Sequence, residues 1–297
     1  MQFMNTSNSN KTALFNLSVV VSMIIWGGSW VSGKAIAGVL PSETLTFWRF
    51  FINLVSFIPI LIFLRQPIKL NRSASVYILL GSICMGLYLY LFFKGLTYGF
   101  AGVGGVMVST MVPLATVALS IILLRQKVLR KDYIGLALGL VGGCILLEIW
   151  SLDWNKLFMS GNIYFLLCAV LWALLTICSQ KAAEWVSPLV FSFFVYAFCS
   201  LLYFFLALPN GLMGVFKQGS FFWLNMLYLA IISSTLATTV YFFASSRLSS
   251  YRASSFVFLV PFSAVIFSWI FLGEVPKIST ITGGLTALAA VYLINMN

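Results

Sequence analysis

The chain has 297 residues, of which 61% are hydrophobic and 8% are charged, and its formal net charge is +11 at pH 7. Because ordinary soluble domains carry about 25% charged residues, this composition excludes an ordinary soluble protein and indicates a membrane protein. The basic residues fall in short connectors between apolar runs, so the charge is typical of membrane topology and argues against a nucleic-acid partner.

Ten apolar stretches are long enough, at about 20 residues each, to cross a bilayer as helices. They cover residues 13–35, 43–64, 74–96, 102–124, 132–150, 160–181, 187–208, 221–246, 252–272 and 279–296. The first stretch exceeds the core of a secretory signal, which runs about 7 to 15 residues, so we expect it to be retained. The sequence therefore predicts an all-α membrane protein with ten transmembrane helices.

Lysine and arginine are divided unevenly between the two sides of this arrangement. With a cytoplasmic N-terminus, the inner side holds Lys11, Arg65, Lys69, Arg72, Arg125, Lys127, Arg130, Lys131, Lys181, Arg247 and Arg252. The outer connectors and helix ends hold Lys34, Lys94, Lys156, Lys217 and Lys277. The excess of basic residues inside predicts that both termini are cytoplasmic. We expect a multi-pass protein of the bacterial inner membrane.

The two halves resemble each other at an offset of about 146 to 148 residues. Trp26 aligns with Trp172, Pro41 with Pro188, and Pro113 with Pro261. Because each half has an odd number of spans, the second must cross in the opposite sense, as in the inverted repeats of transporters. We expect a tail at 1–12, a first five-helix repeat at 13–150, an external linker at 151–159 and a second repeat at 160–297.

Several degenerate motifs accompany this repeat. "WGGSWVSGK" (26–34) precedes Pro41 and Arg49, and "FLGEVP" (271–276) follows the ninth span. With the two proline-containing helices, these motifs resemble the EamA-type members of the drug/metabolite transporter superfamily over nearly the whole chain. The resemblance implies two five-helix halves and, most commonly, export of amino acids or related metabolites. One departure is Arg125-Gln126, which stands where the family has Gly-Glu.

A stripe of side chains on the first helix predicts a transport path. Trp26, Trp30 and Lys34 share one face at spacings of four, and Trp172 and Thr176 repeat this spacing on the sixth helix. The two stripes meet at mid-membrane and lead to opposite surfaces, through Lys34 in one half and Gln180 in the other. The alternative is that Trp30 and Lys34 are interfacial anchors.

Charged residues within the spans are costly and therefore informative. Arg49 lies well inside the second span, and we expect either a structural ion pair with Glu148 or direct contact with an anionic group of the substrate. Lys94 is expected either to extend toward the membrane surface or to face the path.

The remaining candidates are uncharged. Aromatic and hydroxyl side chains of several spans are expected to line a substrate cavity: Tyr88, Thr110, Thr238, Tyr241 and Phe258. Ser109 is a further candidate of the same kind. Pro113 and Pro261 are expected to interrupt equivalent helices, which frees carbonyl groups near a site.

No enzyme motif, metal-ligand cluster or cofactor motif is present in the sequence, and it contains no histidine. We expect a monomer embedded in the lipid bilayer whose partner is a small-molecule substrate. The predicted function is a secondary transporter of small polar or amphipathic metabolites, most commonly an amino-acid exporter. Two alternatives stay open: uptake or exchange of a nucleotide-like cofactor such as S-adenosylmethionine, and a membrane scaffold or lipid-handling protein that does not transport.

Overall fold

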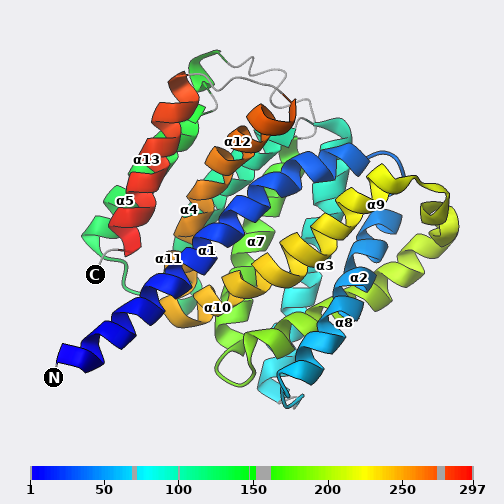
Figure 1. Ribbon diagram of the computed structural model, residues 1–297, viewed down its shortest axis with the longest axis horizontal. Helices are drawn as coiled ribbons and strands as arrows, with labels where there is room; N and C mark the ends of the chain where they lie inside the picture. The colour runs from blue at the N-terminus through cyan, green and yellow to red at the C-terminus, as the bar shows by residue number, and fades with distance from the viewer. Residues whose placement is uncertain are drawn as a thin grey trace.

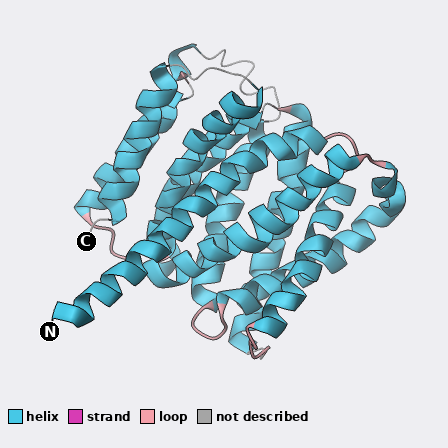
Figure 2. Ribbon diagram, viewed as in Figure 1, coloured by secondary structure: helices cyan, strands magenta, loops and turns pink. Residues whose placement is uncertain are grey.

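The structure is a computed structural model that describes residues 2–68, 72–99, 101–146, 148–151, 162–272 and 278–295. Most of the expected external linker and the Gly273-Glu274 pair lie outside the described residues. Within the described part, all regular structure is helical, and the only bridge between extended segments joins Ala37 to Leu40 (Figure 2). The expected all-α class is confirmed.

The first half contributes five long helices, and a short 3-10 turn η1 follows them. They are α1 (Gln2–Ile36), α2 (Ser42–Phe63), α3 (Arg72–Tyr98), α4 (Ala101–Leu124), α5 (Arg130–Leu146) and η1 (Ile149–Ser151). Helix α1 begins earlier than expected, because neither glycine nor proline occurs between Gln2 and Trp26 to stop it. Its N-terminal end projects beyond the other helices (Figure 1).

The second half is less regular. It contains α7 (Asn162–Ala182), α8 (Pro188–Ala207), the 3-10 turns η2 (Leu208–Asn210) and η3 (Leu212–Lys217), α9 (Ser220–Leu227), the π-helix η4 (Tyr228–Thr238), α10 (Thr239–Leu248), α11 (Ser250–Ser255), the 3-10 turn η5 (Phe256–Leu259), α12 (Val260–Leu272) and α13 (Ile278–Asn295). The start of α8 follows directly from sequence: the Ser187 side chain accepts from the Val190 N–H at 3.4 Å, and Pro188 occupies the first turn.

Seven helical segments of the described chain are long and apolar enough to cross a membrane. They are Leu14–Ile36, Ser42–Phe63, Arg72–Tyr98, Ala101–Leu124, Asn162–Ala182, Pro188–Asn210 and Ser220–Leu248. Helices α5 and α12 have 17 and 13 residues, and the apolar part of α13 is confined to Ile281–Asn295. By length and composition, the described chain therefore has seven candidate spans, and the ten expected from the sequence are not confirmed.

Helices of the two halves pack against each other in matched pairs. Helix α7 of the second half packs against α3 and α4 of the first half. In the same way, α1 of the first half packs against η4 and α12 of the second half. Helix α2 packs on α8 and α5 on α13. Figure 1 shows α5 and α13 side by side at one edge, with α2 and α8 together at the other. This interleaving places residues of both halves around a common centre.

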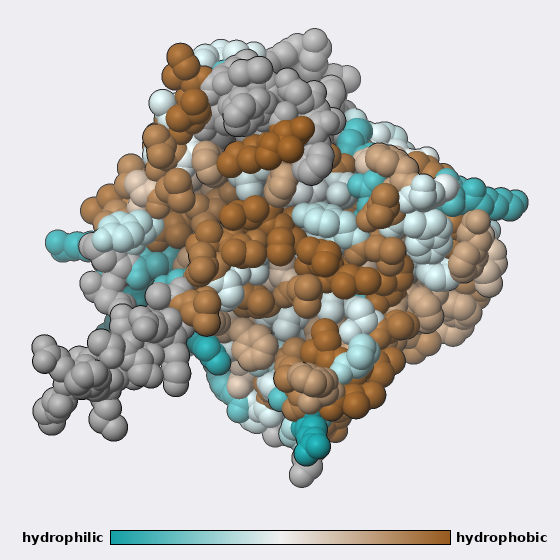
Figure 3. Space-filling view, in the orientation of Figure 1, coloured by the Kyte–Doolittle hydropathy of each residue, from teal (hydrophilic) through white to brown (hydrophobic). Residues whose placement is uncertain are grey.

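The outer surface is largely apolar. Large aliphatic and aromatic side chains such as Phe63, Ile122 and Leu224 are exposed over 86%, 70% and 68% of their area. Figure 3 shows hydrophobic residues spread over the middle of one face, with hydrophilic residues toward its margins. Continuous exposed apolar area of this kind is expected of a surface that contacts lipid.

Candidate functional site

A small cavity lies where helices of the two halves meet. Its volume is about 40 Å³, which is room for a few water molecules. Aromatic side chains line one part of it: Trp26, Trp30, Tyr88, Phe92 and Trp172. Polar side chains line another part: Ser29, Arg49, Ser109, Ser233, Ser234 and Thr238. Aliphatic side chains complete the wall: Met85, Leu89, Val108, Val112, Val257 and Val260. We call this space the central cavity.

The aromatic wall joins α1 to α7. The rings of Trp26 and Trp172 meet edge to face, with centroids 4.9 Å apart. The ring centroid of Tyr88, on α3, lies 4.6 Å from that of Trp172, and the ring centroid of Tyr241, on α10, lies 5.0 Å from that of Trp26. Such tilted and T-shaped pairs are the favoured arrangement of aromatic rings. The equivalent tryptophans of the two halves thus meet in the wall of the central cavity.

Arg49 of α2 is the only charged side chain among the described residues that line the central cavity. It is 5% exposed, and its Nε and Nη2 atoms donate to Ser234 Oγ at 3.2 and 3.0 Å. Its Cζ lies 5.5 Å from the centroid of Phe92, within the range of a cation–π contact. The Nη1 atom is buried and has no hydrogen-bond partner in the described part of the chain. The guanidinium therefore keeps donors that the protein does not use.

The π-helix η4 positions Ser233 and Ser234 at the cavity. In a π-helix, hydrogen bonds run between residues five apart, so side chains change direction relative to an α-helix. Neighbouring side chains bind its carbonyl groups: Trp26 Nε1 donates to Ser233 O at 3.3 Å, and Tyr196 Oη donates to Ser234 O at 3.2 Å. Ser29 and Ser233 share a hydrogen bond of 2.6 Å between their hydroxyls. Side chains of α1 and α8 therefore hold η4 against the cavity.

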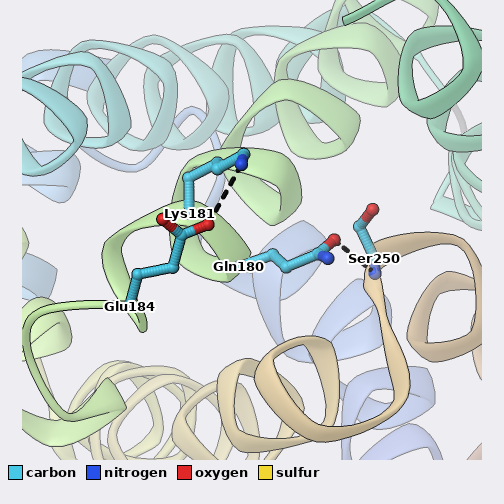
Figure 4. A network of polar contacts seen from close by, with 4 residues as sticks. All are labelled: Gln180, Lys181, Glu184 and Ser250. Atoms are coloured by element: carbon cyan, nitrogen blue, oxygen red, sulfur yellow. Dashed lines mark hydrogen bonds and ion pairs between the residues drawn. The ribbon is translucent and has the colours of Figure 1, made fainter. Parts of the chain in front are cut away.

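The cavity has polar contacts toward both ends of the bundle, and Figure 1 shows the C-terminal ends of α1 and α7 at opposite ends. Near the end of α1, Lys34 Nζ donates to the carbonyls of Leu96 and Gly99 at 2.7 and 2.9 Å. Near the end of α7, Gln180 Oε1 accepts from the Ser250 N–H at 2.8 Å (Figure 4).

Further hydroxyl contacts join the helices at the α7 end. Ser120 and Ser250 are linked at 2.9 Å, and Ser179 and Ser245 at 3.1 Å. With the two carbonyl contacts of Lys34 at the other end, these bonds hold helices together on both sides of the central cavity. The helices are therefore linked by polar contacts on both sides of the central cavity.

The structure brings seven of the predicted residues into the wall of the central cavity: Trp26, Trp30, Arg49, Tyr88, Ser109, Trp172 and Thr238. Thr176 and Tyr241 lie behind that wall, where their hydroxyls share a hydrogen bond of 2.9 Å. Thr110 and Phe258 do not line the cavity. They stand against Gly143 and Gly139 of α5, because glycine leaves room there for a neighbouring side chain.

The predicted charged pair is not formed. Arg49 donates to Ser234, whereas Glu148 Oε1 accepts from Ser279 Oγ of α13 at 2.6 Å. The α5–α13 packing keeps Glu148 with the edge helices. Lys94 lies outside the cavity lining, with Nζ 5.8 Å from the Tyr98 ring centroid.

The two prolines differ in their local structure. Helix α4 continues through Pro113, so the expected interruption is absent there. Pro261 lies in α12, directly after the 3-10 turn η5, and that half does break its α-helical pattern. The stronger departure from α-helical geometry is the π-helix η4, which was not predicted from the sequence.

Sequence reasoning also missed Ser29, Ser233 and Ser234. Serines inside apolar spans commonly bond to their own helix carbonyls, so residue type alone does not identify a site. The available signal was positional: Ser29 lies between Trp26 and Trp30, and Ser233-Ser234-Thr235 is a polar cluster inside an apolar run.

Comparison with known proteins gives matches over both halves. The EamA-like transporter family matches residues 14–147 and again residues 159–296. The "Uncharacterized transporter YetK" of Bacillus subtilis is 27% identical over 270 residues, covering 87% of this chain and 79% of that protein. A "Probable amino-acid metabolite efflux pump" of Salmonella typhimurium is 27% identical over 300 residues, covering 96% and 95%.

Two further comparisons bear on the fold and the choice of solute. An "S-adenosylmethionine uptake transporter" of Rickettsia bellii is 22% identical over 281 residues, covering 93% of this chain and 91% of that protein. A solved structure titled "Crystal structure of protein" superposes with a TM-score of 0.76 at 17% identity, over 95% of this chain and 97% of that one. At that identity, the structural likeness is one of fold alone.

Proposed function

Because this chain belongs to the EamA-like transporter family, we propose that it is a secondary transporter that moves small polar or amphipathic metabolites by alternating access. Amino acids and related metabolites are the proposed solutes, export is the proposed direction, and the bacterial inner membrane is the proposed location. The observation that carries this proposal is the central cavity, where Trp26 of one half meets Trp172 of the other.

The proposed architecture is two inverted repeats of five spans, with both termini in the cytoplasm. The interleaved contacts support it, because α3 on α7 corresponds to η4 on α1, and α4 on α7 corresponds to α12 on α1. Inverted repeats of this kind allow a central site to open alternately to each side of the membrane. The polar contacts at both ends of the bundle then represent a closed stage of that cycle.

A second candidate solute is a nucleotide-like cofactor such as S-adenosylmethionine. Its adenine ring is suited to stack on Trp26, Trp172 or Tyr88, and the relative from Rickettsia bellii is named for its uptake. The aromatic wall suits either solute. The identity of the solute and the direction of transport therefore need separate experiments.

The test is counterflow in proteoliposomes that contain the purified full-length chain. Labelled amino acids and labelled S-adenosylmethionine are offered outside, each with and without the unlabelled compound inside. Acceleration of one label by its internal partner identifies the solute. No acceleration with a broad panel of either class would refute secondary transport and favour a scaffold or lipid-handling role.

Tryptophan variants test the site itself. Trp26→Ala and Trp172→Ala remove rings from the cavity wall, and we expect each to reduce exchange of the accepted solute at least tenfold. Trp150→Ala is the matched control, because Trp150 is 68% exposed and lies outside the cavity lining. Unchanged exchange by both cavity variants, with an unchanged folding transition, would remove the tryptophans from the site.

A further inference from the structure

The central cavity contains a buried positive charge, and no acidic side chain stands among the described residues of its wall. Of the described residues in its wall, only Arg49 carries a charge, and it is 5% exposed. A charge inside a membrane protein is costly unless it is paired, so such residues commonly serve a ligand or an ion path. Glu148, the carboxylate expected from sequence to pair with it, instead accepts a hydrogen bond from Ser279.

The hydrogen bonds of Arg49 leave one edge of the guanidinium unused. Ser234 Oγ accepts hydrogen bonds from the Nε–H and from one N–H of Nη2, at 3.2 and 3.0 Å. The side chain has five N–H donors in a fixed plane, and no described residue accepts a hydrogen bond from Nη1. The remaining Nη1/Nη2 edge is a fork that fits the two oxygens of a carboxylate.

Two features of the surroundings strengthen this geometry. Ser234 is itself held in place, because its hydroxyl donates to Leu229 O at 3.0 Å and Tyr196 donates to its carbonyl. Phe92 and Phe93 lie 5.5 and 5.9 Å from Arg49 Cζ and limit access of water to the guanidinium. The charge is therefore oriented and largely dehydrated before a solute arrives.

We propose that Arg49 is the receptor for a carboxylate group of the solute, and that the accepted solutes are carboxylates with an apolar or aromatic part that packs on Trp26, Trp30 and Trp172. This inference rests on the proposed transport function and narrows its substrate class. Amines that lack a carboxylate are disfavoured, since they bring a second positive charge to a cavity without an acid. Both an α-amino acid and S-adenosylmethionine carry the required carboxylate, so the recognition chemistry is shared by the two candidates.

The cavity volume of about 40 Å³ sets a condition on binding. Ligand pockets commonly have volumes of about 300–1,000 Å³, so a solute enters only when the helices separate at one end. The carboxylate then binds the Nη1/Nη2 edge while the rings close on the apolar part. Arg49 contributes affinity and selectivity in this scheme, and the aromatic wall contributes contact area.

The test compares four phenyl compounds as competitors of the accepted labelled solute in wild-type proteoliposomes. L-Phenylalanine and 3-phenylpropionate carry a carboxylate, whereas L-phenylalaninamide and 2-phenylethylamine do not. We expect the two carboxylates to compete at least tenfold more strongly than the two compounds without one. Because this series uses only the wild-type protein, it does not depend on whether any variant folds.

Variants then assign the preference to Arg49. We expect Arg49→Gln to lose the preference for carboxylates and Arg49→Lys to keep a weaker form of it, since lysine keeps the charge without the planar fork. Arg72→Gln is the matched control, because Arg72 is an exposed cation at the start of α3, outside the cavity lining. Equal competition by all four compounds in the wild type, or an unchanged preference in folded Arg49→Gln, overturns the inference while leaving transport intact. Absence of any labelled exchange by the wild type instead overturns the proposed function.

Discussion

The contact between Arg49 and Ser234 makes a quantitative prediction for stability. Replacing Ser234 by alanine removes the acceptor of both the Nε and Nη2 donors and leaves the buried guanidinium without that hydrogen-bond partner. Hydrogen bonds to charged groups contribute about 1.5–3 kcal/mol in soluble proteins. Interhelical couplings measured in membrane proteins are smaller, with a maximum of about 1.7 kcal/mol. We therefore expect a coupling energy of about 1–2 kcal/mol between the two side chains.

A double-mutant cycle measures this coupling energy. The free energy of unfolding is measured in mixed micelles for the wild type, Ser234→Ala, Arg49→Gln and the double variant. Ser234→Ala should destabilise the wild type more than it destabilises Arg49→Gln, because only the first case strands a charge. Ser234→Ala also removes the hydrogen bond from Ser234 to Leu229 O. This loss occurs in both the wild-type and the Arg49→Gln background, so it cancels in the cycle.

A neutral pair between the same helices provides the matched control. Ser56 and Thr235 share a hydrogen bond of 2.7 Å that involves no charge. Its cycle, with Ser56→Ala and Thr235→Ala, should give a coupling near the membrane-protein average of about 0.6 kcal/mol. A coupling below about 0.5 kcal/mol for Arg49 and Ser234 would fall within the range of independent sites and refute the reasoning.

Three further changes test other parts of the structure. Gly142→Ala should lower the free energy of unfolding by about 1–3 kcal/mol, because a Cβ there would lie 2.9 Å from the carbonyl oxygen of Gly283 and force α5 away from α13. Tyr196→Phe should lower it by about 0.5–1.5 kcal/mol, since the hydroxyl is buried and donates to Ser234 O. Gln180→Leu should speed deuterium exchange at the Ser250 amide, because it removes the acceptor of that N–H.

Each of these changes has a control in the same chain. Gly102→Ala should not destabilise, because no neighbouring atom lies within 4 Å of a Cβ built there. Tyr98→Phe should have little effect, since Tyr98 is 59% exposed. Lys181→Leu removes the partner of Glu184 in a surface ion pair of 3.0 Å and should leave exchange at Ser250 unchanged (Figure 4). Equal effects of a variant and its control would contradict the corresponding contact.

Hydrophobic run length predicted most of the helices, because a run of apolar residues that must satisfy its own backbone in lipid has few other options. Residues 43–64 were expected as one span and form α2 at Ser42–Phe63; residues 102–124 form α4 at Ala101–Leu124. The stretch 221–246 was expected as one span and forms the continuous helical segment Ser220–Leu248, but its middle part, η4, is a π-helix. Its apolar pattern does not reveal this, since a π-helix and an α-helix require the same hydrophobic residues.

The sequence repeat predicted the meeting of Trp26 and Trp172, because it aligns them at mid-depth of corresponding spans, and their rings are in contact. It did not predict the partner of Arg49, since that partner is supplied by η4, which has no counterpart of the same kind in the first half. Thr110 and Phe258 were chosen for residue type alone. Their orientation depends on glycines of α5, which a single helix does not reveal.

The π-helix also makes the two halves unequal at the central cavity. In a π-helix each hydrogen bond joins residues five apart, so the side chains of η4 leave the helix in directions that an α-helix would not give them. Ser234 of η4 accepts both hydrogen bonds of Arg49, which belongs to α2. The charge therefore comes from one half of the chain and its hydroxyl partner from the other, so the binding chemistry at the cavity differs between the halves.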